Sequence, residues 1–353
     1  MFEIIKNWYE RHFSDPNAVA LVLVIGGVLA AVLLIGDVLA PVIVATVLAY
    51  LLEGVVMSME RFKIPRPIGA IVVMLGFLAL GLAFTFGLVP LIYEQISQLI
   101  SETPRMISSL QGQWLALVAQ YPEILTASSA DELFNSLRAQ LSQLGQVIVT
   151  FSLSNVGNVI SLTIYSILVP MMVFFALKDK VVILRWVSRF LPNRSDISSR
   201  VWADVDEKIA NYIRGKFIEI LIIGGASYVS FVFLGLNYSL LLALLVGLSV
   251  IIPFIGAFAV TVPVLLIGFF QWGIGSDFYT LLVVYLIIQV LDGNVLVPIL
   301  FSEVVNLHPL AIIVAVTFFG GIWGMWGVFF AIPLATLVQA VLKVWPSIDL
   351  ESE

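Results

Sequence analysis

Cysteine is absent from this 353-residue chain, and histidine occurs only twice. Without cysteine there is neither a disulfide nor a thiolate ligand for a metal ion. His12 and His308 are too few for a histidine-based metal site or catalytic triad. The G-x-x-x-x-G-K-[ST], H-E-x-x-H and G-x-S-x-G motifs are also missing. We therefore expect no cofactor and no enzyme; a pair of Asp37 and Asp292 is the remaining enzymatic alternative, but neither has recognisable catalytic flanks.

Charge is scarce as well. Charged residues make up 11% of the chain and hydrophobic residues 61%, with a mean hydropathy of +1.08. This composition lies far outside that of soluble domains, so an integral membrane protein in contact with lipids is predicted. Nothing basic enough to bind nucleic acid is present, so no nucleic-acid partner is expected.

The apolar runs have the length of membrane-spanning helices. A bilayer core about 30 Å thick requires about 20 apolar helical residues. Several runs match that length, namely residues 17–36, 68–92, 156–177, 217–236 and 278–297. A shorter run at 38–52 contains Pro41 near its start, which would tolerate the sharp turn expected there between two helices. With two longer runs described below, the pattern predicts an all-α fold of about eight transmembrane segments in a single polytopic domain, residues 1–353.

The run at 239–271 is too long to be a single span. The sequence I-P-F-I-G at 252–256 interrupts it, and Pro253 removes a helical hydrogen bond while Gly256 loosens the backbone. Broken or re-entrant helices at membrane depth are tolerated where the freed backbone is packed in protein or faces a wet cavity. The break is therefore a candidate for a transport pathway, and a plain hairpin is the alternative.

The run at 310–343 is also too long, and the glycine-rich sequence at 320–327 interrupts it. Gly320 and Gly324 are pathway candidates for the same reason. Close helix packing through small residues is the alternative interpretation of these glycines.

Lysine and arginine are unevenly distributed between the loops. Nine of the seventeen lie in 178–216, whereas 93–155 contains two. The positive-inside rule places 178–216 in the cytoplasm as a basic loop and 93–155 on the opposite side. Apolar residues at helical spacing predict an extracytoplasmic helical hairpin in 93–155 and an amphipathic helix in 196–216. The hairpin is expected to pack on itself, on a neighbouring subunit or on the membrane surface.

Polar residues lie inside the span at 278–297. Asp292 is about 21 Å along this helix, where a charge costs about 2.5–3.5 kcal/mol on insertion scales. Gln289 and Asn294 lie close to it in sequence. Asp292 is a candidate for taking up and releasing a proton or for holding a cation. Alternatively, Asp292 and Asn294 hydrogen-bond the freed backbone of a broken neighbouring helix.

Two basic residues open the span at 217–236. Arg214 and Lys216 are candidates for a gate or for attracting an anion to the inner mouth of a pathway. The alternative is local, because Lys216 and Glu219 have the i, i+3 spacing of an ion pair.

Several motifs in the carboxy-terminal half resemble the autoinducer-2 exporter family of bacterial permeases, specifically its PerM-like branch. They are YIRGK at 212–216, IPFIG at 252–256, DGNVLVP at 292–298, NLHPLAI at 306–312 and GGIWGMWGVFFAIPLAT at 320–336. The resemblance implies a multi-pass permease of the bacterial inner membrane with both termini in the cytoplasm. It also implies a homo-oligomer, pentameric in family members. Relatives often have glutamine where this chain has Lys216, so an uncharged role does not carry over to that position.

These observations lead to one functional hypothesis and one alternative. The hypothesis is secondary transport, as export of a small polar solute or ion coupled to protons or cations. Its pathway would pass Gln289, Asp292 and Asn294 and the breaks at Pro253, Gly256, Gly320 and Gly324. The alternative is a membrane scaffold or partner-binding protein in which the outer hairpin is the functional part.

Overall fold

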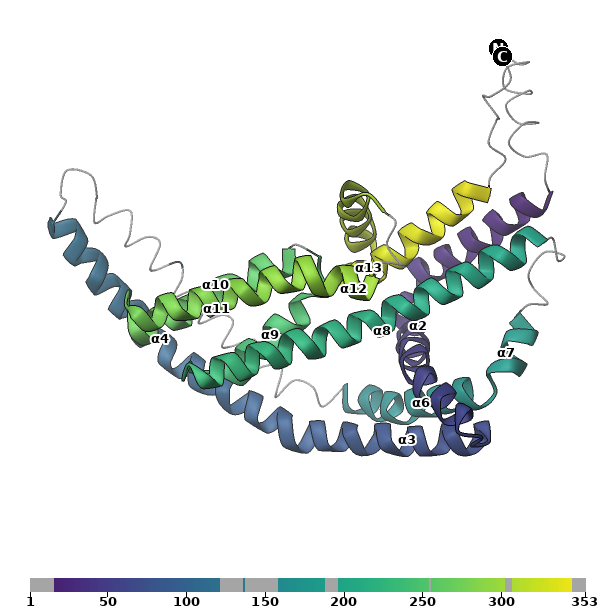
Figure 1. The fold of residues 1–353 in the computed structure, drawn as a ribbon, viewed down its shortest axis with the longest axis horizontal. Helices are drawn as coiled ribbons and strands as arrows, with labels where there is room; N and C mark the ends of the chain where they lie inside the picture. The colour runs from purple at the N-terminus through teal and green to yellow at the C-terminus, as the bar shows by residue number, and fades with distance from the viewer. Residues whose placement is uncertain are drawn as a thin grey trace, which may run out of the picture.

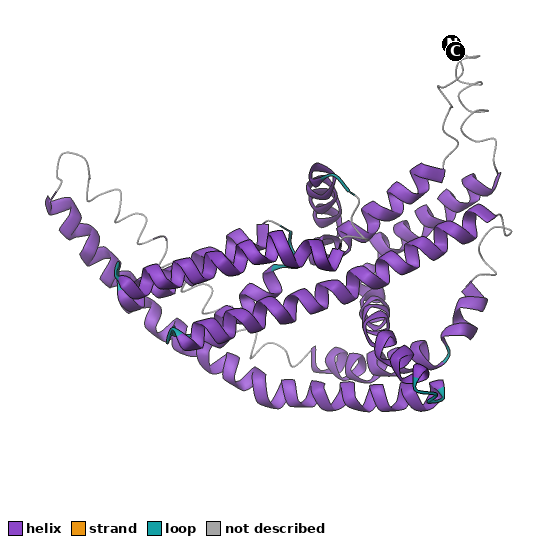
Figure 2. Cartoon of the chain, viewed as in Figure 1, coloured by secondary structure: helices purple, strands orange, loops and turns teal. Residues whose placement is uncertain are grey.

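The computed structural model describes residues 16–120, 136, 158–187, 196–253, 255–301 and 307–344. Among these residues every regular element is helical and none is a strand, which confirms the predicted all-α fold (Figure 2). The chain is a multi-pass membrane protein. Six helices are long and apolar enough to cross a membrane: Val38–Arg61, Arg66–Ser109, Asp206–Phe233, Ile255–Trp272, Ser276–Phe301 and Pro309–Gln339. Ile164–Lys178 and Ser239–Ser249 are shorter apolar helices, so the total of about eight spans stays a prediction.

The elements follow one another along the chain as shown in Figure 1. The first group is α2 (Pro16–Arg61), α3 (Arg66–Ala83), the π-helical turn η1 (Phe84–Leu88), α4 (Val89–Gln120), α6 (Asn158–Lys178) and α7 (Lys180–Val187). The second group is α8 (Asp196–Phe233), α9 (Ser239–Ser249), α10 (Ile255–Trp272), α11 (Ser276–Leu291), the π-helical turn η2 (Asp292–Leu296), α12 (Val297–Phe301) and α13 (Pro309–Val344).

The first two predicted spans belong to one helix. The expected turn at Pro41 is wrong, because α2 continues from Pro16 to Arg61 with that proline inside it. Figure 1 shows α2 changing direction along its length. An interior proline removes one hydrogen bond and bends a helix without necessarily ending it.

Two other predicted loops contain extensions of spanning helices. The amphipathic helix expected in 196–216 continues directly into the next span as α8, with no proline to end it between residues 196 and 233. The first half of the segment at 93–155 lies in α4, which follows α3 through η1. Its second half lies outside the described residues except for Ser136, which is helical. The hairpin therefore stays a prediction.

Both predicted breaks in the long apolar runs are present. Helix α9 ends at Ser249 and α10 begins at Ile255. Inside α13, Gly324 has φ 59° and ψ −138°, a backbone conformation that residues with a Cβ rarely adopt. Figure 1 shows the two halves of α13 running in different directions.

Glycine sets the close approach of backbones at these breaks. A Cβ on Gly256 would lie 1.8 Å from the Ser249 carbonyl oxygen, and a Cβ on Gly327 would lie 1.8 Å from that of Phe319. Neither contact is possible for a larger residue, so each glycine lets the chain reverse tightly on itself.

Two apolar cores organise the helices. The larger joins α8, α9, α10 and α11 around Phe231, Leu242, Val264 and Tyr285, and α4 packs against it. The smaller joins α2, α3 and α6. Helix α8 extends along both groups and connects them (Figure 1).

An ion-pair cluster ties together the ends of the smaller group. The Glu53 carboxylate lies 2.7 Å from Arg66 Nη2 and 3.2 Å from Lys180 Nζ. Arg66 Nε also donates a hydrogen bond to the Leu177 carbonyl oxygen at 2.8 Å. Two cations and a backbone acceptor therefore hold the start of α3 against α2, α6 and α7.

Helices α8 and α9 cross through a pair of glycines. A Cβ on Gly247 would lie 3.0 Å from Gly224 Cα and 3.0 Å from the Ile220 carbonyl oxygen. Such small-residue contacts are the usual means of close helix packing in membranes.

We predict that Gly247→Ala lowers the stability of the purified protein by about 1–3 kcal/mol, because the added methyl group forces two backbones apart. The measurement is the thermal unfolding midpoint in detergent. Gly225→Ala is the matched control, since a Cβ there meets nothing within 4 Å. The control should leave the midpoint unchanged or raise it, because alanine favours a helix by about 1 kcal/mol over glycine. Equal midpoints for both variants would contradict close packing at Gly247.

Candidate functional site

A cavity of about 440 Å³ lies where α8, the α9–α10 break, η2, α12 and α13 meet. Its polar lining comes from Tyr212, Lys216, Glu219, Gln289 and Asp292. The remaining wall is largely apolar and includes Pro253 at the break. A volume of this size falls in the usual range for small-molecule sites, which combine apolar walls with a few convergent polar groups.

A buried ion pair forms one wall of the cavity. Lys216 and Glu219 are 5% and 2% exposed, and Lys216 Nζ lies 2.7 Å from Glu219 Oε2. The i, i+3 spacing on α8 places both side chains on one face. Lys216 Nζ also lies 5.2 Å from the centroid of the Phe301 ring. Each charge needs the other, because a lone ion in this apolar setting would be costly.

Glycine again allows the close contact around this pair. A Cβ on Gly215 would lie 2.8 Å from the Phe301 ring. The ring therefore packs directly on the α8 backbone, beside Tyr212 with a centroid separation of 5.8 Å. Tyr212 Oη donates a hydrogen bond to the Phe329 carbonyl oxygen at 3.0 Å and so links α8 to α13.

Asp292 stands at the first position of η2, opposite the ion pair. It is 9% exposed, and its Oδ1 has no hydrogen-bond partner among the described residues. Gln289 lies three residues earlier on the same wall. The cavity wall therefore contains an unsatisfied acceptor. Buried polar atoms without partners are uncommon in proteins. Single π-helical turns such as η2 are frequent at functional sites. Both features therefore mark this cavity as a candidate site.

Four of the residues predicted from the sequence meet in this cavity. Gln289 and Asp292 come from the α11–η2 helix, Lys216 from α8 and Pro253 from the α9–α10 break. The predicted Lys216–Glu219 ion pair is present.

The other candidate residues lie outside the cavity lining. Asn294 is exposed, and its Nδ2 donates a hydrogen bond to the Val290 carbonyl oxygen of the same helix at 2.9 Å. Gly256 packs against Ser249, beside the lining residue Ala257. Arg214 packs against α2, where a Cβ on Gly54 would lie 3.6 Å from its Cδ.

Gly320 and Gly324 serve the break in α13. Gly324 supplies the positive φ of 59°. A Cβ on Gly320 would lie 2.7 Å from Val328 Cγ2, across the break. A Cβ on Gly324 would meet nothing within 4 Å, so of these two glycines only Gly320 makes a close contact.

Sequence reasoning did not select Glu219, Tyr212 or Phe301 as site residues. The i, i+3 spacing from Lys216 was a usable signal for Glu219. No comparable signal exists for Phe301, because it lies 86 positions beyond Gly215 and meets it only through tertiary packing.

We predict that Glu219→Gln destabilises the protein by about 3–5 kcal/mol, because it leaves Lys216 buried without its partner charge. The double variant Lys216→Met/Glu219→Gln should recover much of the loss, since it removes both charges together. Thermal unfolding in detergent at neutral pH measures both. If the double variant is less stable than Glu219→Gln, the two residues do not act as a pair.

Residues 19–347 match the sequence model of a family described as AI-2E family transporter. A protein of Escherichia coli (strain K12) named permease PerM is 43% identical over 353 residues, which covers 100% of both chains. A Bacillus subtilis (strain 168) protein named transport protein YueF is 29% identical over 308 residues, covering 84% of this chain and 81% of the relative. These matches confirm the resemblance predicted from the motifs.

Proposed function

Because the chain belongs to the AI-2E transporter family, we propose that it exports a small polar solute or ion across the bacterial inner membrane by secondary transport, coupled to protons or cations. The cavity between α8, α11–η2 and α13 is the proposed binding site. No nucleotide-binding loop occurs in the sequence, which favours an ion gradient as the source of energy.

The observation that carries this proposal is the unpaired Asp292 beside a complete ion pair. If Lys216, Glu219 and Asp292 are all ionised, the cavity has one negative charge in excess. Lys216 Nζ lies 2.7 Å from Glu219 and donates its hydrogen bond there, whereas Asp292 Oδ1 has no partner among the described residues. A proton or a cation at Asp292 restores neutrality.

Charge neutralisation provides the coupling. An ionised aspartate inside the hydrocarbon region costs about 2.5–3.5 kcal/mol on insertion scales. The conformation in which Asp292 is enclosed is therefore favoured when a proton or cation is bound, and the conformation in which it meets water is favoured when the site is empty. A ligand with different affinity for two conformations shifts their populations by that difference.

The surrounding backbone suits such a change. The α9–α10 break at Pro253 and the wider turn of η2 lie on two sides of the cavity. Broken helices next to a binding site allow one group of helices to move against another in secondary transporters.

We also propose that both termini are cytoplasmic and that the protein is a homo-oligomer, with a pentamer as the expected form. Large apolar side chains are exposed on several spanning helices, among them Phe233 at 88% and Phe258 at 78%. Bilayer lipid and neighbouring subunits are the surroundings that accommodate such surfaces.

The test is solute efflux from proteoliposomes, with and without an imposed proton gradient, using a panel of small polar solutes. Asp292→Asn should reduce gradient-stimulated flux at least tenfold, because the amide cannot exchange a proton or balance a cation. Asp277→Asn is the matched control on the same helix, since Asp277 is exposed in the first turn of α11. Full gradient-stimulated flux in Asp292→Asn would remove this residue from the mechanism.

A further inference from the structure

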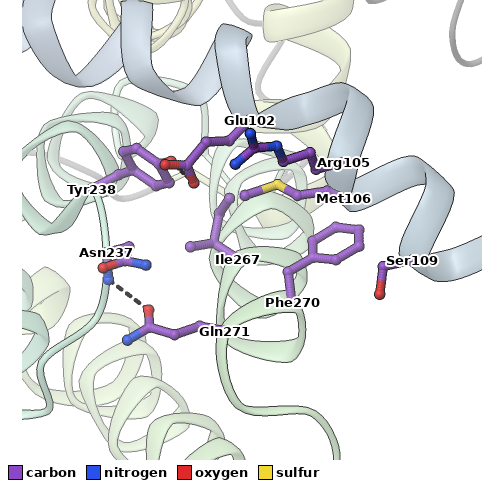
Figure 3. Close-up of a pocket in the computed structure, with 9 residues that line it drawn as sticks. All are labelled: Glu102, Arg105, Met106, Ser109, Asn237, Tyr238, Ile267, Phe270 and Gln271. Carbon is purple, nitrogen blue, oxygen red and sulfur yellow. Dashed lines mark hydrogen bonds between the residues drawn. The ribbon is translucent and has the colours of Figure 1, made fainter.

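We propose that a second, separate pocket binds a zwitterionic ligand, one that carries both an ammonium group and a carboxylate or phosphate. The pocket has a volume of about 360 Å³ and lies between α4, the start of α9 and the end of α10 (Figure 3). Its charged residues are Glu102 and Arg105, and Asn237 and Gln271 contribute amides. The inference is independent of the proposed transport.

The pocket is remote from the central cavity. Ala257 lines the central cavity near the beginning of α10, and Gln271 lines the second pocket near its end. The 14 residues between them correspond to about 21 Å of helix. Two sites at opposite ends of one spanning helix face different depths of the membrane.

Glu102 and Arg105 present opposite charges to the same space. They are three residues apart on α4 and therefore lie on one face of the helix. Figure 3 shows both side chains extending from α4 at the pocket. Despite this spacing, no ion pair joins them, and the Arg105 guanidinium has no partner among the described residues. Both charges remain available to a ligand.

Tyr238 holds the Glu102 carboxylate in place. Its Oη donates a hydrogen bond to Glu102 Oε2 at 2.7 Å. Burial raises the pKa of the Tyr238 phenol to about 12, helped by its hydrogen bond to Glu102. The phenol therefore stays protonated at neutral pH and continues to donate, while Glu102 Oε1 is left for a ligand.

The floor of the pocket is also preformed. Gln271 Oε1 accepts a hydrogen bond from the Asn237 backbone N–H at 2.7 Å, and Gln271 Nε2 donates one to the Gly235 carbonyl oxygen at 2.7 Å. These bonds, the first of which is drawn in Figure 3, fix the loop between α8 and α9 against α10. The Asn237 side chain has no partner among the described residues and remains free to bind.

The balance of charge selects the ligand class. One carboxylate and one guanidinium give a pocket with no net charge, so an anion or a cation alone would leave one of them unmatched. A zwitterion pairs both, with its anionic group on the planar fork of Arg105 and its ammonium on Glu102. Met106, Ile267 and Phe270 provide an apolar wall for the rest of the ligand. Free amino acids and the headgroup of phosphatidylethanolamine share this chemistry.

The test is isothermal titration of the purified full-length protein in detergent with two zwitterionic probes, L-leucine and dihexanoyl-phosphatidylethanolamine. Each has charge-deleted counterparts. For L-leucine these are 4-methylpentanoate and 3-methylbutylamine, and for the lipid it is dihexanoyl-phosphatidylglycerol. A zwitterionic probe should bind at least tenfold more tightly than its counterparts. Binding of L-leucine identifies a free solute as the ligand, and binding of the phosphatidylethanolamine alone identifies a lipid headgroup.

Substitutions locate the binding. Glu102→Gln and Arg105→Gln should each weaken it at least tenfold, and Arg105→Lys should weaken it less, because the charge stays while the planar fork is lost. Glu102→Gln retains an acceptor for Tyr238, so its thermal unfolding midpoint should match that of the unsubstituted protein. Glu94→Gln and Arg61→Gln are matched controls at exposed positions. The proposal is overturned if neither zwitterion binds, or if binding is equal in the pocket variants and the controls.

Discussion

The ion pair between Lys216 and Glu219 is the interaction around which the centre of this protein is arranged. Two charges inside an apolar helix are tolerated only when each satisfies the other, and the 2.7 Å contact does so within one turn of α8. The neighbouring side chains pack around this pair. The Phe301 ring covers Lys216, and Gly215 has no Cβ to keep the ring away from the α8 backbone. This covered pair and Asp292 line the same cavity, whose remaining wall is largely apolar.

Backbone breaks determine how that space is enclosed. At the α9–α10 break Gly256 lets the backbone lie directly against Ser249, and Pro253 in this break lines the cavity. Gly324 performs the corresponding task in α13 through its positive φ. Unbroken helices pack side by side and fill the space between them, whereas reversed helices leave room at the turn. The polar groups of the cavity lie beside such interruptions.

Only part of the site was predictable from the sequence. Gln289 and Asp292 were identifiable because ionisable and amide groups are rare inside apolar runs. Asn294 has the same property, but it lies two residues beyond Asp292 and therefore on another side of the helix. There it is exposed and bonds a carbonyl oxygen of its own helix. The fold was likewise only partly predictable at Pro41. A proline removes the same hydrogen bond whether the helix bends or ends there, so the sequence does not distinguish the two outcomes.

The sequence by itself determined that this protein is an all-helical, multi-pass member of a transporter family. Helix length, apolar content and break points are local properties, and each can be recognised without knowing the neighbours. The tertiary structure alone decided which polar residues share a cavity and which charges remain unpaired. Lys216 contacts the ring of Phe301, and Glu102 accepts a hydrogen bond from Tyr238, although each pair is separated by many residues in the sequence. Such contacts depend on how whole helices cross, and crossing is set by the combined packing of all of them.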